Sequence, residues 1–175
     1  ARTPYEKKSA LEKQFEDNWE DLRGKGKIIG VHVRGTDMKN NLGHPMPADL
    51  LQYFEEAEKM ISADDKIAAI FLAADEKAVI EEFRSKFEGK SEVIVNEAFR
   101  ADEQKGGRKT GIHELKADKI RNRHKYKMGL EVLKDAWCLS RCNYLVCGHS
   151  NVTNAVILWN NHQFEKVVCV ESKKE

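Results

Sequence analysis

Short apolar runs alternate along this chain with longer stretches in which apolar residues recur at helical spacing. The short runs have the length of buried strands, whereas the longer stretches place their apolar side chains on one helix face. The pattern predicts strands over residues 27–33, 66–73, 92–96, 143–147 and 165–170, and helices over residues 4–22, 48–61, 76–87, 126–141 and 151–161. Because crossover helices cover both faces of such a sheet, the alternation predicts an α/β fold, a Rossmann-like doubly wound parallel sheet of about five strands.

The first predicted helix is amphipathic and precedes the first strand. It opens on a capping-box sequence with proline at the first helical position, Thr3-Pro4-Tyr5-Glu6. Its apolar stripe consists of Leu11, Phe15, Trp19 and Leu22. We therefore divide the chain into an N-terminal helix and linker at residues 1–26, packed on a ligand-binding domain at residues 27–175.

Three predicted strands end in residues of a kind that binds phosphate or nucleotide. The first runs into Arg34-Gly35-Thr36-Asp37, the second into Asp75, and the fourth into a Gly-His-Ser-Asn turn at 148–151. Gly35 lets a ligand approach the backbone, and the guanidinium of Arg34 has donors matched to phosphate oxygens. Since ligands bind outside the carboxyl ends of parallel strands, we expect these segments to form one site.

Each candidate residue also has a purely structural interpretation. His32 lies in an apolar strand and could be a hydrogen-bonded core histidine. Asp75 could cap a helix that starts at Glu76, and Ser150 is a natural helix cap. Asp135 could pair with a basic residue of its own helix, although its apolar neighbours predict a partly buried position where an unpaired carboxylate is costly.

Composition excludes several classes of partner. The 30 lysines and arginines balance 29 acids, so there is no overall field that would attract nucleic acid or an anionic membrane. No apolar run approaches the roughly 20 residues that a bilayer span needs. The chain starts at Ala1 without an initiator methionine or a signal peptide, so we expect it to be a piece of a longer protein.

The four cysteines, at positions 138, 142, 147 and 169, lack the Cys-x-x-Cys or histidine spacing of a metal site. We expect them to be buried, reduced thiols. The sequence Asn151-Val152-Thr153 is formally a glycosylation site, but a glycan there would occupy the predicted phosphate turn. Both features favour a cytoplasmic protein. A secretory lumen is the alternative if the parent protein is a eukaryotic Golgi or ER enzyme.

Three sequence motifs carry a resemblance to a known family. They read H-V-R-G-T-D, F-L-A-A-D-E, and D-A-W-C-L-S followed by Y-L-V-C-G-H-S-N-V. In order and spacing they resemble the peptide motifs of the fucosyltransferase superfamily, which holds the α-1,6-fucosyltransferases, the rhizobial nodulation type and the protein O-fucosyltransferases. The resemblance covers residues 27–170. It implies the donor-binding half of a GT-B glycosyltransferase that transfers fucose from GDP-fucose to a glycan or protein acceptor, without a metal cofactor and with the N-terminal acceptor-binding domain missing here.

The resemblance also implies residue roles. Arg34 would grip the diphosphate and stabilise charge on the leaving nucleotide, which makes it the catalytic residue. Asp135 would read the guanine edge, and Asp75 would contact the base or ribose. Ser150 and its neighbour would hold phosphate oxygens. The implied donor-binding set is His32, Arg34, Gly35, Asp37, Asp75, Asp135, Gly148, Ser150 and Asn151.

The first motif departs from the α-1,6 pattern. Gly35 and Met38 stand where those enzymes carry a second arginine and a lysine, and residues 39–42 supply no base-like glutamate. His44 is a conceivable substitute for that base. Two alternatives therefore stay open: a GT-B transferase that uses another nucleotide sugar, and a non-catalytic nucleotide-binding module.

Overall fold

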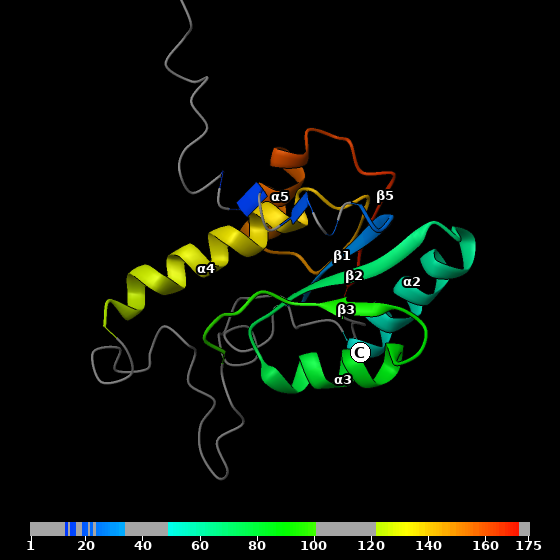
Figure 1. The fold of residues 1–175 in the computed structure, drawn as a ribbon, viewed down its shortest axis with the longest axis horizontal. Helices are drawn as coiled ribbons and strands as arrows, with labels where there is room; N and C mark the ends of the chain where they lie inside the picture. The colour runs from blue at the N-terminus through cyan, green and yellow to red at the C-terminus, as the bar shows by residue number, and fades with distance from the viewer. Residues whose placement is uncertain are drawn as a thin grey trace, which may run out of the picture.

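The computed structural model describes residues 13, 15, 16, 19, 20, 22, 24–33, 49–100 and 122–171. Within them, five parallel strands form one sheet in the order β3-β2-β1-β4-β5 (Figure 1). The strands are β1 (Lys27–Val33), β2 (Ile67–Ala74), β3 (Glu92–Ile94), β4 (Tyr144–Cys147) and β5 (Lys166–Cys169). The helices between them are α2 (Leu50–Ala63), α3 (Lys77–Phe87), α4 (His124–Leu139) and α5 (Asn151–Asn160). The predicted doubly wound α/β fold is confirmed.

Strand β1 is the centre of the sheet and the point where its winding reverses. The chain runs from β1 outward to β2 and β3, and then returns to place β4 on the other side of β1 and β5 beyond it. Residue His32 faces Ala73 of β2 and Cys147 of β4 in the register. In sheets of this kind ligands bind outside the carboxyl ends of the strands at such a reversal, here between β1 and β4.

Helices cover both faces of the sheet (Figure 1), and an apolar core cluster lies on each face. On one face, helices α2 and α3 pack Ala57, Phe83 and other apolar side chains against alternate strand residues such as Val31. On the other face, α4 and α5 pack against the strand residues of opposite parity, such as Phe71. This alternation is the reason that the strand runs are apolar throughout.

The described residues between 13 and 22 are helical. Phe15 and Trp19 are buried, and their rings lie 5.9 Å and 6.3 Å from that of Trp137 on α4. Trp19 also meets Phe71 of β2 edge-on at 5.6 Å. The prediction of a helix packed by these aromatic residues is confirmed for this part, whereas the rest of the predicted helix, including Leu11, lies outside the described residues.

Two expectations about local structure are wrong. Asp75 does not cap α3, because the helix begins at Lys77 and its N-cap residue is Glu76, which makes no side-chain capping bond. Cys169 is exposed rather than buried, because β5 is an edge strand, whereas Cys138, Cys142 and Cys147 are free and buried as expected.

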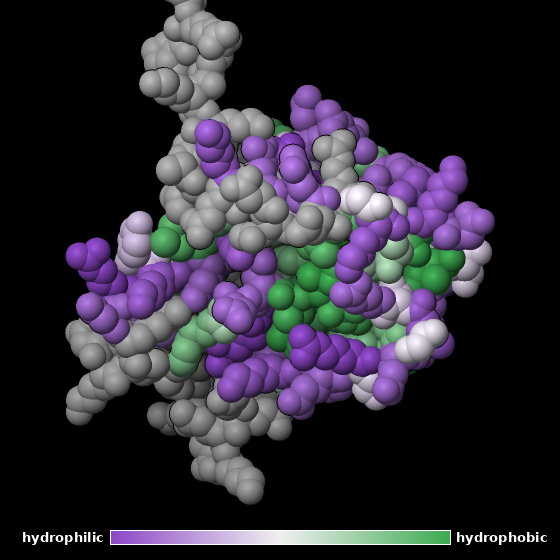
Figure 2. Space-filling model, viewed as in Figure 1, coloured by the Kyte–Doolittle hydropathy of each residue, from purple (hydrophilic) through white to green (hydrophobic). Residues whose placement is uncertain are grey.

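Strand β3 forms the other edge of the sheet and is shorter than predicted. It ends at Ile94, and Asn96 leaves the sheet to donate a hydrogen bond toward α4. Figure 2 shows hydrophobic residues gathered over this edge, with hydrophilic residues around them. A short edge strand offers few open backbone groups to another chain.

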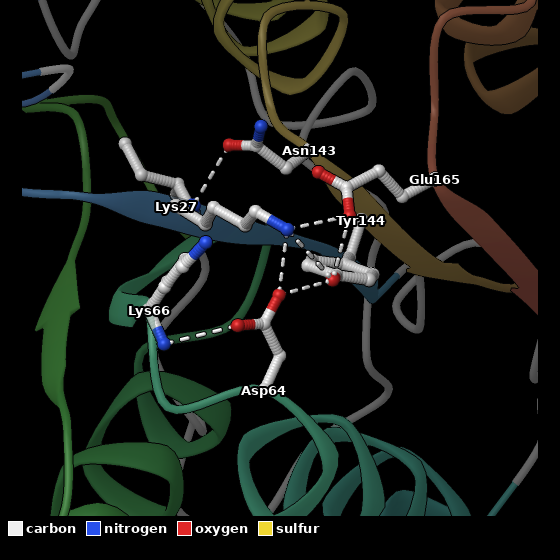
Figure 3. Close-up of polar contacts among 7 residues, drawn as sticks. Lys27, Asp64, Lys66, Asn143, Tyr144 and Glu165 are labelled. Carbon is white, nitrogen blue, oxygen red and sulfur yellow. Dashed lines mark hydrogen bonds and ion pairs between the residues drawn. The ribbon is translucent and has the colours of Figure 1, made fainter.

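A polar network fastens the amino edge of the sheet (Figure 3). The Nζ of Lys27, at the start of β1, lies 2.7 Å from Asp64 and 2.6 Å from Glu165. The Tyr144 hydroxyl lies 2.6 Å and 2.9 Å from the same two carboxylates. These hydrogen bonds hold the pKa of Asp64 and Glu165 below their usual values, with Lys27 as the main cause. The network joins β1 and β4 to the segments that lead into β2 and β5, at the edge opposite the predicted site.

In the part of the chain that the structure describes, no helix is long and apolar enough to cross a membrane.

Candidate functional site

The carboxyl ends of β1, β2 and β4 lie side by side at the reversal point of the sheet. Asp75 follows β2 directly, and the turn at 148–150 follows β4 and opens α5. The backbone N–H of Gly148 donates to the carbonyl of His32 at 3.4 Å, which extends the contact between β1 and β4 by one residue. Arg34, Gly35 and Asp37, which follow β1, lie outside the described residues.

One hydroxyl group, that of Thr153 on α5, joins three of the predicted site residues. It lies 3.0 Å from Nδ1 of His32, donates to the Gly148 carbonyl at 2.8 Å, and accepts from the Ser150 hydroxyl at 3.1 Å. Because the single hydroxyl proton goes to Gly148, Nδ1 of His32 carries a proton and donates it to Thr153.

The same residues form the amino end of helix α5. Ser150 is the N-cap residue, and its hydroxyl accepts a hydrogen bond from the Thr153 backbone N–H at 3.0 Å. Asn151, the first helical residue, is exposed. The unpaired N–H groups and the dipole at a helix N-terminus favour bound anions such as phosphate. The sequence folds in this way because a serine after a Gly-His turn supplies the cap that starts the helix.

Gly148 allows a close approach of the chain to helix α2. A Cβ atom built at Gly148 would lie 2.7 Å from the hydroxyl oxygen of Tyr53, closer than real contacts allow. Tyr53 is buried, and this burial raises the pKa of its phenol. A larger residue at 148 would therefore displace either the phenol or the turn.

A second polar group lies beyond β3, around Asp135 on α4. The Nδ2 of Asn96 donates to Oδ1 of Asp135 at 2.8 Å. Burial raises the pKa of the Asp135 carboxyl to about 6, although the Asn96 hydrogen bond and the charge of Arg100 both act to lower it. The predicted partly buried position is confirmed, but the partner comes from a distant segment and not from α4 itself.

Arg100 fixes the backbone around this second group. Its Nε donates to the carbonyl of Ala74 at 3.0 Å, and its Nη2 donates to the carbonyl of Asn96 at 2.6 Å. It is buried, so these backbone contacts tie the end of β2 to the segment after β3. The residue next to Ala74 is Asp75, so Arg100 connects the second group to the strand ends at the reversal point.

The structure thus brings His32, Gly148 and Ser150 together through Thr153, and it places Asp135 in a separate group beside β3. Sequence reasoning did not single out Thr153, Tyr53, Asn96 or Arg100. The sequence did contain a sign of Thr153, because it stands three residues after Ser150, a predicted N-cap residue. The side chain of an N-cap residue accepts a hydrogen bond from the backbone N–H at that position. No local pattern marks the others, since their partners come from distant segments.

This arrangement can bind an extended anionic ligand. The capped N-terminus of a helix can bind phosphate oxygens. The carboxylate of Asp135 can accept two hydrogen bonds from a base that has two adjacent N–H donors. In the described residues, no group of three or more histidine, cysteine, aspartate or glutamate side chains is placed to hold a metal ion.

Comparison with known proteins places the chain near one family. The family model of the alpha-(1,6)-fucosyltransferase N- and catalytic domains matches residues 5–154. The fold is similar to NodZ α-1,6-fucosyltransferase co-crystallised with GDP, with a TM-score of 0.58 and 18% identity over 91% of this chain and 43% of that chain. It is also similar to POFUT1 in complex with GDP-fucose, with a TM-score of 0.58 and 11% identity over 94% of this chain and 47% of that chain. The chain thus spans less than half the length of these two structures.

Proposed function

Since the chain belongs to the alpha-(1,6)-fucosyltransferase family, we propose that it is the donor-binding half of a GT-B glycosyltransferase that takes fucose from GDP-fucose. The observation that carries the proposal is the turn at 148–151. It lies at the reversal point of the sheet, caps α5 through Ser150, and is joined to His32 through Thr153. NodZ was co-crystallised with GDP and POFUT1 is in complex with GDP-fucose, which supports the same donor class.

In this proposal the diphosphate lies against the amino end of α5. The backbone N–H groups there, with Ser150 and Asn151, bind its oxygens. Arg34 follows β1 in the sequence, and it adds the bidentate cation that stabilises the leaving nucleotide as the glycosyl bond breaks. His32, Gly35, Asp37 and Gly148 belong to the same donor-binding set.

The guanine would lie toward Asp135. An ionised carboxylate accepts two hydrogen bonds, and guanine offers two adjacent donors, N1–H and N2–H, whereas uracil offers one N–H. Asn96 holds Asp135 in place through its 2.8 Å bond. Asp75 completes the donor site at the base or ribose, and we propose that no metal ion takes part in binding.

Transfer to an acceptor needs a second half. Because the chain covers 43% to 47% of the matched structures, we propose that an acceptor-binding domain elsewhere in the parent protein receives the glycan or protein acceptor. We also propose that residues 1–26 serve as the linker and packing helix between that domain and the donor-binding domain.

The departures at Gly35 and Met38 favour a second candidate, a nucleotide-binding module without transfer activity. Hydrolysis of GDP-fucose by the parent protein separates the two candidates. Slow release of fucose supports a transferase, whereas tight GDP-fucose binding with no release supports the binding module.

Titration of the chain with GDP, GDP-fucose, GDP-mannose and UDP tests the proposal. We expect the chain to bind GDP and GDP-fucose much more tightly than UDP. The variant Asp135→Asn should weaken GDP by about 1.5–3 kcal/mol, as for a lost charged hydrogen-bond acceptor, and should leave UDP nearly unchanged. Equal affinity for all four ligands, or equal losses for GDP and UDP in the variant, would contradict the assignment.

A further inference from the structure

Two free cysteines lie side by side at the carboxyl edge of the sheet, next to the turn at 148–151. Cys147 ends β4 and Cys169 ends β5, and the two residues face each other in the register of the parallel pair. Their sulfur atoms are 3.5 Å apart, within hydrogen-bonding distance. The Cys147 sulfur also lies 3.8 Å from the carbonyl oxygen of Val168.

The two thiols differ in their access to solvent. Cys147 is buried, and Cys169 is exposed. Burial raises the pKa of the Cys147 thiol, which keeps it protonated and unreactive toward reagents in solution. Cys138 and Cys142 are buried as well, so Cys169 is the free cysteine that a soluble oxidant meets first.

We propose that Cys147 and Cys169 form a reversible thiol–disulfide site, oxidised by a low-molecular-weight disulfide such as glutathione disulfide. Neighbouring strands lie about 4.8 Å apart, which falls inside the range of about 4.4–6.8 Å between the Cα atoms of bridged cysteines. Facing residues of a parallel pair also point to the same side of the sheet. The backbone therefore already has the spacing that a bridge requires.

The reaction takes place in two exchange steps. The Cys169 thiolate attacks one sulfur of the oxidant, forms a mixed disulfide and releases one thiolate. The Cys147 thiol then loses its proton, its sulfur attacks the Cys169 sulfur, and the second thiolate leaves. Two cysteine thiols are oxidised by two electrons, one disulfide is reduced to two thiols, and the two cysteine protons pass to the released thiolates.

Oxidation of this pair would disturb the turn that follows β4. Cys147 precedes Gly148 directly, and the Gly148 carbonyl accepts a hydrogen bond from the Thr153 hydroxyl, which also bonds His32. A bridge shortens the 3.5 Å separation of the two sulfur atoms to a bond of about 2.0 Å, which pulls the end of β4 toward β5 at the residue before the turn. This second part of the proposal rests on the proposed function, because it takes the turn as the phosphate-binding element.

Thiol mapping of the folded protein tests the site itself. After incubation with glutathione disulfide, we expect peptide mapping to find Cys147 linked to Cys169, with Cys138 and Cys142 still free and with full reversal by dithiothreitol. Cys169→Ser should stay reduced at Cys147, and Cys147→Ala should stop at a glutathione adduct on Cys169. A persistent adduct on Cys169 in the natural sequence, or no reaction, would overturn the proposal.

Nucleotide titration tests the link to the turn. We expect the oxidised protein to bind GDP roughly five-fold more weakly than the reduced protein, the size of effect expected for one lost neutral hydrogen bond. Cys169→Ser should bind GDP normally before and after treatment. Equal affinity of the bridged and reduced forms would refute the link, whereas failure of the reduced protein to bind GDP would refute the proposed function and leave the disulfide site standing.

Discussion

Thr153 connects the central strand to the turn at 148–150 through a single buried hydroxyl group. It bonds His32, Gly148 and Ser150; the imidazole of His32 comes from β1, and the carbonyl of Gly148 directly follows β4. Removal of this hydroxyl would break these three hydrogen bonds at once. At the scale of the residue, the candidate site therefore depends on a side chain that is not expected to touch the ligand.

Thr153→Val keeps the shape of the side chain and removes the hydroxyl. We expect the free energy of unfolding to fall by about 1–3 kcal/mol, the cost of leaving buried hydrogen-bonding groups unsatisfied. GDP affinity should fall as well, because Ser150 and Gly148 lose their anchor. Urea unfolding and a GDP titration measure the two effects, and Thr153→Ser, which keeps the hydroxyl, should preserve most of both. Unchanged stability in Thr153→Val would contradict the role given to this hydroxyl.

Asp135 gives the protein a pH dependence of its own. Its folded-state pKa is raised to about 6, so the folded protein holds this proton more tightly than the unfolded chain does. The stability that the protonated group contributes is complete below about pH 4 and is lost as the pH rises through about 6. We therefore expect the natural protein to lose stability relative to Asp135→Asn over this range, as measured by urea unfolding at several pH values. Parallel stability curves would show that the carboxyl is not desolvated.

GDP affinity should also depend on the protonation of Asp135, but it should rise with pH where the stability falls. Guanine recognition needs the ionised carboxylate, so GDP affinity should rise as the pH increases through about 6. Asp135→Asn should lose this pH dependence. Any dependence that remains in the variant comes from protonation of the nucleotide phosphate, so the variant is the control.

At the level of single elements, the strands could be predicted from the sequence to within two residues. This succeeded because β1, β2 and β4 are buried on both faces, and such strands read as continuous apolar runs. The end of β3 was less predictable, because Asn96 leaves the sheet to bond Asp135 on α4. The candidate site shows the same contrast. The residues at the strand ends could be predicted from the sequence, whereas the hydrogen bonds of Thr153 and Arg100 could not.

The network around Lys27 makes a testable element-scale contribution. Lys27→Met should lower the urea midpoint, because two neighbouring carboxylates lose their shared cation. Since the pKa values of Asp64 and Glu165 are lowered in the folded protein, the stability that they contribute is present at neutral pH and is lost as the pH falls below about 4. Lys25→Met, which removes an exposed pair with Glu92, is the matched control and should change little.

Lys27→Met should leave GDP affinity unchanged, because the network lies at the edge of the sheet opposite the turn at 148–151. A large loss of GDP affinity in a folded Lys27→Met protein would mean that the two edges are coupled, contrary to this account.

As a whole molecule, the chain is one α/β unit whose matched relatives are about twice as long. The reversal of winding between β1 and β4 brings His32, Gly148 and Ser150 to one edge, although they come from segments far apart in the sequence. Gly35 and Met38 leave Arg34 as the one cation of the first motif, so turnover should depend on it heavily.

In the parent protein, Arg34→Ala should reduce fucose transfer by about 100-fold or more, as expected for a lost electrostatic stabiliser of the transition state. GDP affinity should fall less, because the charge on the leaving group grows only as the bond breaks. Steady-state kinetics with a circular dichroism check of folding measures this, and Arg34→Lys tests whether the bidentate geometry matters. Near-normal turnover in folded Arg34→Ala protein would remove the arginine from the mechanism.

We propose that the carboxyl edge between β1 and β4 holds the nucleotide of the donor. A crystal structure of the chain with GDP bound tests it most directly. We predict that the diphosphate lies at the amino end of α5, within hydrogen-bonding distance of Ser150 or Asn151, and that the guanine edge meets Asp135. A nucleotide bound elsewhere, or a diphosphate at this edge with its base turned away from Asp135, would contradict the account.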